Sequence, residues 1–443
     1  MDFDAIKYPR PYYDTGVGVH AGANAYYPLG ENEGLFDSML QDLRSMGITW
    51  IKFLDVDGTS YNACRVAFKW GMMPVVRVYR PKPNPGTLEP KQKSSIQLLR
   101  SLGVAYFERN NEPNLVEEWE TWPTTWTTAT FDKQAYDWYT DAQYIASLGG
   151  LTAIDALSPG GNYDDITYLI NFLTSLKKIP NISTTFLKNH AWIAVHPAGL
   201  NHPINYPDDP INQKEHPGQT IHTHYYKDGT PTGASNCVRK WEAVGKIFYD
   251  MFGYIIPVMA TEGSFWSGNK ADSRYPELTQ WSASDLNVEL LKSMKSYPKW
   301  YMANMPWLLS NRLFGNKNEG FERDAWWRIP GWGNCPIYEM DKLPLCTILR
   351  SSPVQERGAM LEDRIAAKAQ TVIIPLNPAA ALEKAAKDIG DGRLPASPEF
   401  TLEDNGIVYV GQAFRKEEER DKQFIAYVKY NDWNNVRWIE KDN

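Results

Sequence analysis

The stretch Tyr106-Phe107-Glu108-Arg109-Asn110-Asn111-Glu112-Pro113-Asn114, YFERNNEPN, runs from apolar residues into amides, a carboxylate and a proline. The apolar start is typical of a short buried strand, and a proline, which lacks a backbone N–H, favours the end of that strand. Glu112 is therefore predicted to follow a strand directly and to lie among uncharged amides. Such neighbours suit a carboxylic acid that stays protonated near neutral pH.

Similar short β-type runs alternate with amphipathic helical runs through the first three quarters of the chain. This alternation indicates βα units and a parallel sheet. Eight strands with seven intervening helices match a (β/α)8 TIM barrel, and the lack of a glycine-rich loop after the first run disfavours an open doubly wound sheet. The predicted strands are residues 16–20, 50–55, 74–79, 104–108, 151–157, 191–196, 255–261 and 300–305.

The alternation fails after about residue 311, where a segment rich in glycine, proline and tryptophan begins. A helical run at 377–390 and two β-type runs at 406–414 and 423–433 follow. We therefore expect a catalytic barrel over residues 1–335 and a C-terminal extension over 336–443, of mixed helix and strand, as a small accessory domain or as strands that pack on the barrel.

Composition narrows the possible partners. The 443 residues include 17 Trp and 25 Tyr, which either fill a large core or line a groove for a ligand with flat C–H faces, as sugars have. The net charge of -7 and the lack of a basic run predict no nucleic-acid partner. No apolar run is long enough to span a membrane, and the N-terminus has no signal-peptide pattern. We expect a cytoplasmic protein, or a secreted one whose leader was removed; oligomeric state is not indicated.

A second carboxylate, Glu262, follows the seventh predicted strand in PVMATEGSFW. The C-terminal ends of the strands form the working face of such a barrel, so Glu112 and Glu262 are expected to face each other across its mouth. Two carboxylates at short distance permit double displacement at an anomeric carbon, in which one protonates the leaving oxygen and the other attacks. Glu262 would then need hydrogen-bond donors or a cation to remain ionised.

The NEP triplet after strand four and a glutamate after strand seven resemble the signature of clan A retaining glycoside hydrolases, a superfamily of (β/α)8 barrels. The resemblance covers roughly residues 10 to 335. It implies that Glu112 is the acid/base, that Glu262 is the nucleophile, and that Asn111 binds the 2-hydroxyl of the reactive sugar. It also implies that Trp307, in NMPWLLSN, lies beneath that sugar, that the substrate is a β-linked oligo- or polysaccharide, and that no cofactor or metal takes part.

Other matches to the clan are looser. His196 falls after strand six, where many members carry a histidine or tyrosine near the nucleophile. A long excursion follows it, and Tyr225 or Tyr226 within the excursion is an alternative for that role. Arg77 is a candidate for the cation beside Glu262, with Arg80 as its rival.

Two other classes of function compete with this interpretation. A non-catalytic carbohydrate-binding barrel would keep the aromatic groove but would not need both glutamates. A metal-dependent barrel hydrolase would use His196, His222 and His224, with the Asp208-Asp209 pair close by. Because the HxH pair lies in a loop rather than at a strand end, loop packing is the simpler explanation for it.

Overall fold

The computed structural model describes residues 3, 7–11, 13–22, 33–234, 236–310, 324–328, 341–357, 381–397, 399–404, 407–416, 419, 422–430 and 432–442. The chain divides into two compact units. The larger contains Met1–Phe3 and Thr15–Arg357, and the smaller contains Asp4–Asp14 and Gly358–Asn443. The sequence places the boundary at residue 335, whereas the structure groups the chain through Arg357 with the barrel.

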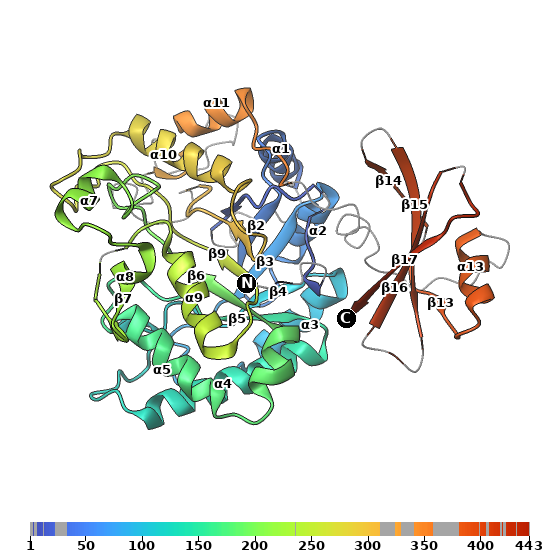
Figure 1. Cartoon of the computed structure of the whole chain (residues 1–443), viewed down its shortest axis with the longest axis horizontal. Helices are drawn as coiled ribbons and strands as arrows, with labels where there is room; N and C mark the ends of the chain where they lie inside the picture. The colour runs from blue at the N-terminus through green and yellow to red at the C-terminus, as the bar shows by residue number, and fades with distance from the viewer. Residues whose placement is uncertain are drawn as a thin grey trace. The chain divides into compact units, whose positions relative to one another are not determined.

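The larger unit is a (β/α)8 barrel, as predicted (Figure 1). Its eight parallel strands lie in the order in which they occur along the chain. Closure comes from a parallel bridge between Val17 and Asn304, reinforced where the His20 N–H donates to the Pro306 carbonyl at 2.9 Å. The strands are β1 (Gly18–His20), β2 (Trp50–Asp55), β3 (Met73–Val78), β4 (Tyr106–Glu108), β5 (Leu151–Ile154), β6 (Ala191–Val195), β9 (Val258–Ala260) and β10 (Tyr301–Asn304).

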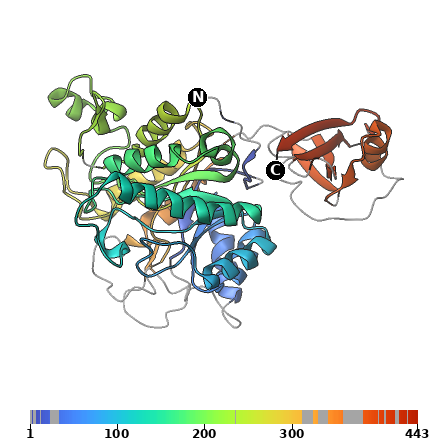
Figure 2. The same ribbon diagram turned by 90° about the horizontal axis from the view of Figure 1, so that it is seen from below.

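The predicted helices lie between these strands and surround the barrel (Figures 1 and 2). They are α1 (Glu33–Ser45), α2 (Tyr61–Lys69), α3 (Pro90–Leu102), α4 (Thr128–Ser147), α5 (Asp165–Lys177), α9 (Lys240–Phe252) and α10 (Gln280–Ser293). A further helix, α11 (Pro344–Ser351), packs beside α10 and explains why residues beyond 335 belong to this unit. Among the described residues, no helix is both long and apolar enough to cross a membrane.

Alternation along each strand divides its side chains between two cores. In β2, Ile51 and Phe53 belong to the large apolar cluster between strands and helices, while Trp50 and Lys52 point the other way, into the barrel. The Trp50 ring lies 5.6 Å from that of Tyr106, which lies 5.9 Å from that of Trp192. These aromatic residues come from alternate strands and fill one interior layer, as is usual in such barrels.

The next interior layer toward the C-terminal ends of the strands is charged. Two residues after Trp50 and Tyr106, on the same faces of β2 and β4, come Lys52 and Glu108, both buried. Lys52 Nζ lies 2.7 Å from Glu108 Oε2. This ion pair lies at the bottom of the open end of the barrel, directly above the aromatic layer.

The smaller unit has its own core around a five-stranded antiparallel sheet. The strands β13 (Leu394–Pro395), β14 (Phe400–Asp404), β15 (Ile407–Arg415), β16 (Lys422–Lys429) and β17 (Arg437–Asp442) make up this sheet, and the two central strands are those predicted. Helix α13 (Ala381–Ile389) covers one face through Leu382 and Ala386.

A buried charge network supports the strand ends near the mouth. Arg109, fully buried, lies 2.8 Å from Asp141 of α4 and 3.4 Å from Asp155 after β5. Replacing it with methionine leaves two buried carboxylates without their cation. We expect Arg109→Met to lower the free energy of unfolding by about 3 to 5 kcal/mol, because a broken buried ion pair leaves an uncompensated charge.

Urea unfolding measured at neutral pH tests this expectation. The control is Lys91→Met, which removes an exposed lysine 3.9 Å from Asp57 and is expected to cost less than about 1 kcal/mol. Equal small effects of the two substitutions would contradict the structural role of Arg109.

Candidate active site

Glu112 lies in the loop after β4, which a buried asparagine holds in place. The Asn114 side chain is fully buried, and its Nδ2 donates to the carbonyls of Ser158 at 2.8 Å and Tyr163 at 3.0 Å. This joins the loop after β4 to the loop after β5. Glu112 reaches the mouth partly exposed, and its Oε1 lies 2.8 Å from His196 Nδ1.

Glu262 follows β9 and is surrounded by basic groups. Its Oε1 lies 2.8 Å from Arg77, 3.2 Å from Lys52 Nζ, 3.6 Å from His20 Nε2 and 3.8 Å from His196 Nε2. Burial alone would raise the pKa of Glu262, but His196, Lys52, Arg77 and His20 outweigh it and hold this pKa well below its usual value. Glu262 is therefore ionised at neutral pH.

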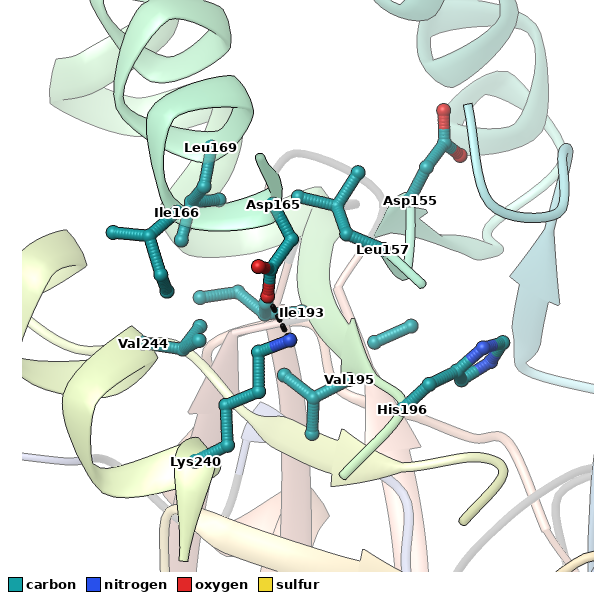
Figure 3. Close-up of a pocket in the computed structure, with 11 residues that line it drawn as sticks. Asp155, Leu157, Asp165, Ile166, Leu169, Ile193, Val195, His196, Lys240 and Val244 are labelled. Carbon is teal, nitrogen blue, oxygen red and sulfur yellow. Dashed lines mark ion pairs between the residues drawn. The ribbon is translucent and has the colours of Figure 1, made fainter. Parts of the chain in front are cut away.

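His196 links the two carboxylates. One ring nitrogen faces Glu112 and the other faces Glu262. The histidine follows β6, and its other side borders a mostly apolar cavity of about 20 Å³ (Figure 3). In this cavity Lys240, which begins α9, points to Asp165, which begins α5, and forms a buried ion pair with it. The pair ties together the helices that follow β5 and β6, and so supports the strand that carries His196.

Arg77, not Arg80, is the arginine beside Glu262. Arg77 lies near the end of β3 and also donates to Asn111 Oδ1. Arg80 donates instead to the Thr87 carbonyl at 2.7 Å and to Asn110 Oδ1. Because Arg77 occupies Asn111 Oδ1, the amide Nδ2 of Asn111 points the other way and donates to Glu118 Oε1 at 2.8 Å.

Sequence reasoning missed three residues of this site: Lys52, His20 and Glu118. Lys52 carries a signal in retrospect, since a lysine within the apolar run WIKFLD of a barrel strand is buried on either face and needs a charged partner there. Burial, followed by the charge of Lys52, lowers the pKa of His20 well below 6.5. Its Nδ1 accepts from the Gly22 N–H at 2.9 Å, so the neutral ring directs its Nε2 hydrogen toward Glu262.

Glu118 is a third carboxylate near the pair and lies on a short 3-10 turn (Val116–Glu118). Burial chiefly raises its pKa, and the Glu112 and Glu262 carboxylates add to this effect, against the opposing influence of Asn111 and Arg77. Nothing in its sequence context distinguishes it from its neighbour Glu117.

Trp307 follows β10 and lies beside His20. The two residues pair in a parallel bridge, and their rings are 4.5 Å apart in an edge-to-face arrangement. The Trp307 side chain is only partly buried. The structure therefore brings Trp307 together with Glu112, Glu262, Asn111, His196 and Arg77.

Tyr225 lies away from these residues. It ends α8 (Ile221–Tyr225) in the long excursion after β6, and it is buried, with its hydroxyl accepting from the Cys237 N–H at 2.9 Å. Tyr226 begins a short strand, β7 (Tyr226–Lys227), and its ring lies 5.7 Å from that of His222. Neither tyrosine therefore belongs to the set that we propose.

The histidines of the excursion serve packing. His224 lies edge-to-face with Tyr206 at 5.2 Å, while Asp209 caps α7 (Pro210–Glu215) and Asp208 pairs with Arg239. Over the part of the chain that the structure describes, no three His, Cys, Asp or Glu side chains are grouped to hold a metal ion. Accordingly, the arrangement of donors does not favour a site built from His196, His222 and His224.

No protein-family model matches the sequence, and no curated protein matches it. Several solved structures are similar to this chain. An endo-β-1,3-glucanase from Pseudomonas viridiflava is 14% identical, with 77% of this chain and 99% of that chain covered and a TM-score of 0.44. One from Sorangium cellulosum is 12% identical, with the same coverage and a TM-score of 0.41. A β-glucuronidase from Faecalibacterium prausnitzii is 12% identical over 78% of this chain and 50% of that chain, with a TM-score of 0.41. These values do not establish an activity for this chain.

The ion pairs of Glu262 lead to a prediction about the pH dependence of stability, which can be tested without a substrate. Its pKa is depressed in the folded protein from an unfolded value near 4.5, so its ion pairs stabilise the fold above that pH. This contribution is lost as the pH falls through the folded pKa. We expect the stability difference between wild type and Glu262→Gln to be present at neutral pH and to shrink below about pH 4.5.

Urea unfolding of both proteins at pH 7, 5, 4 and 3 measures this difference. Glu277→Gln, which removes an exposed glutamate 3.7 Å from Lys270, is the control and should show little dependence on pH. A Glu262→Gln difference that stays constant down to pH 3 would show that Lys52 and Arg77 do not stabilise the ionised form.

Proposed function

We propose that this chain hydrolyses β-glycosidic bonds of an oligo- or polysaccharide with retention of configuration. One observation carries the proposal: two glutamates at the barrel mouth have different surroundings, Glu262 in ion pairs with Lys52 and Arg77 and Glu112 against the ring of His196. A permanently ionised carboxylate is suited to attack an anomeric carbon, while one free to change its protonation state suits acid/base work.

In the first step Glu112 donates its proton to the departing glycosidic oxygen while Glu262 attacks the anomeric carbon and forms a glycosyl ester. In the second step Glu112, now ionised, takes a proton from water as the water displaces Glu262. His196 supports both states of Glu112, because its Nδ1 can accept a hydrogen bond from the acid or donate one to the carboxylate.

The surrounding side chains have supporting roles in this mechanism. Lys52 and Arg77 keep Glu262 ionised before attack, and Glu108 holds Lys52 in position. Asn111, whose amide lies between Arg77 and Glu118, would bind the sugar 2-hydroxyl. Trp307 offers a flat, partly exposed face beneath that sugar. The chemistry needs no metal or organic cofactor.

The first test measures reducing-sugar release from a panel of β-linked polysaccharides by wild type, Glu262→Gln and Glu112→Gln. On any substrate that wild type cleaves, we expect Glu262→Gln and Glu112→Gln each to lose at least about 10²-fold in kcat/KM. Glu277→Gln should keep full activity. Undiminished cleavage by Glu262→Gln would contradict its assignment as nucleophile.

A second measurement separates the two roles. Aryl β-glycosides whose leaving groups are good need little protonation, so Glu112→Gln should retain far more activity on them than on poor leaving groups. Glu262→Gln should be impaired equally on both. The anomer released first, followed by NMR, should be β; release of the α anomer would contradict retention.

A further inference from the structure

A small polar cavity lies beside the proposed catalytic pair. Its volume is about 60 Å³, and its lining includes Arg77 and Asn111 of the site together with Arg80, Asn110, Glu118 and the half-exposed Tyr79. Because Arg77 and Asn111 also contact the groups described above, this cavity adjoins the position of the reactive sugar. Nothing in the proposed chemistry uses it.

Arg80 brings a guanidinium with an unused donor to this cavity. Its side chain is 8% exposed, and its hydrogen bonds go to two neutral oxygens, the Thr87 carbonyl and Asn110 Oδ1. Its Nε is buried without a hydrogen-bond partner. Among the residues that the structure describes, Arg80 forms no ion pair with a carboxylate.

The neighbouring arginines differ from Arg80 in this respect. Arg77 is paired with Glu262, and Arg109 is paired with Asp141 and Asp155. Burial, followed by the repulsion of Arg109, lowers the pKa of Arg80 to about 10, although the carboxylates of Asp141, Asp155 and Glu89 act in the opposite direction. A buried donor without an acceptor is destabilising, so a carboxylate that enters the cavity and accepts from Arg80 Nε would relieve a cost that the free protein bears.

We propose that the Arg80 cavity binds the carboxylate of a uronic acid unit of the substrate. The proposal rests on the glycoside hydrolase function above. A guanidinium offers the planar donor pair that a carboxylate matches. A cavity of this size receives a carboxylate but not a whole sugar ring, so the ring itself lies in the open mouth of the barrel.

The position of Asn111 indicates which unit carries the carboxylate. If Asn111 binds the 2-hydroxyl of the reactive sugar, the cavity lies on the C2 side of that ring. In a pyranose the uronic carboxylate is attached to C5, across the ring from C2. The carboxylate at Arg80 therefore belongs to a neighbouring unit of the chain.

Glu118 opposes this binding, so substitutions of Glu118 and Arg80 should change the preference for an acidic substrate in opposite directions. It lines the same cavity, and its Oε1 accepts from Asn111. When ionised, it repels an incoming carboxylate. A glutamine at this position keeps an oxygen acceptor for Asn111 and removes the charge, so Glu118→Gln should favour the anionic substrate while Arg80→Gln disfavours it.

The experiment compares kcat/KM on a uronic-acid-containing β-glycan with that on the same polymer after its carboxyl groups are reduced to alcohols. We expect wild type to prefer the acidic polymer by about tenfold or more, the effect of one charge-assisted contact. Arg80→Gln should abolish that preference and leave the rate on the reduced polymer unchanged. Arg80→Lys should keep part of the preference, and Glu118→Gln should increase it.

Several outcomes would overturn the proposal. Equal values of kcat/KM for wild type on both polymers would do so. An equal loss of kcat/KM on both polymers in Arg80→Gln would also do so, since that marks a purely structural arginine.

If wild type cleaves neither polymer nor any other β-glycan, the proposed function fails. The inference is then decided by calorimetric binding of the acidic and reduced oligosaccharides to wild type and Arg80→Gln, where equal affinities would reject it. Competition by acetate or chloride as strong as that by the acidic oligosaccharide would assign the cavity to free small anions instead.

Discussion

The ion pairs between Glu262 and the basic residues at the barrel mouth are the constraint on which the site depends. Lys52 rises from inside the barrel and Arg77 comes from the neighbouring strand, and both reach the same carboxylate oxygen. The surrounding protein by itself would raise the pKa of this carboxylate, and the basic neighbours reverse that effect. The cations therefore keep Glu262 ionised, while Glu112 lies on the far side of His196 from them.

The layered packing of side chains inside the barrel makes this concentration of charge possible. The aromatic layer of Trp50, Tyr106 and Trp192 closes the interior below Lys52 and Glu108 and separates the charges from water on that side. Glu108 offsets part of the positive charge, so that Lys52 is shared between two carboxylates. Since parallel strands display alternate residues inward, one lysine two positions beyond a tryptophan is enough to place an ammonium group under the mouth.

The predicted strands and helices, and the proposed catalytic pair, followed from local signals. Eight apolar runs separated by amphipathic helices leave few other arrangements once the chain must bury a parallel sheet on both faces. Glu112 and Glu262 were found because each directly follows a strand. Tyr225 was a candidate only through its place in the long excursion, and its hydroxyl turned out to be engaged with Cys237 in the core. Loop length does not reveal which way a side chain points.

The sequence by itself determined the order of strands and helices, the barrel that this order requires, and the two glutamates at its C-terminal end, because periodicity and strand ends are local properties of the chain. Tertiary structure alone decided which cation serves which carboxylate. Arg77 and Arg80 are three positions apart, yet one reaches Glu262 and the other is buried beside neutral oxygens. Lys52 and His20 are distant from Glu262 in the sequence, and only closure of the barrel brings them beside its carboxylate, where burial makes the charge of Lys52 matter. Glu118 is seven positions from Asn111, and the loop after β4 folds back to join the two side chains.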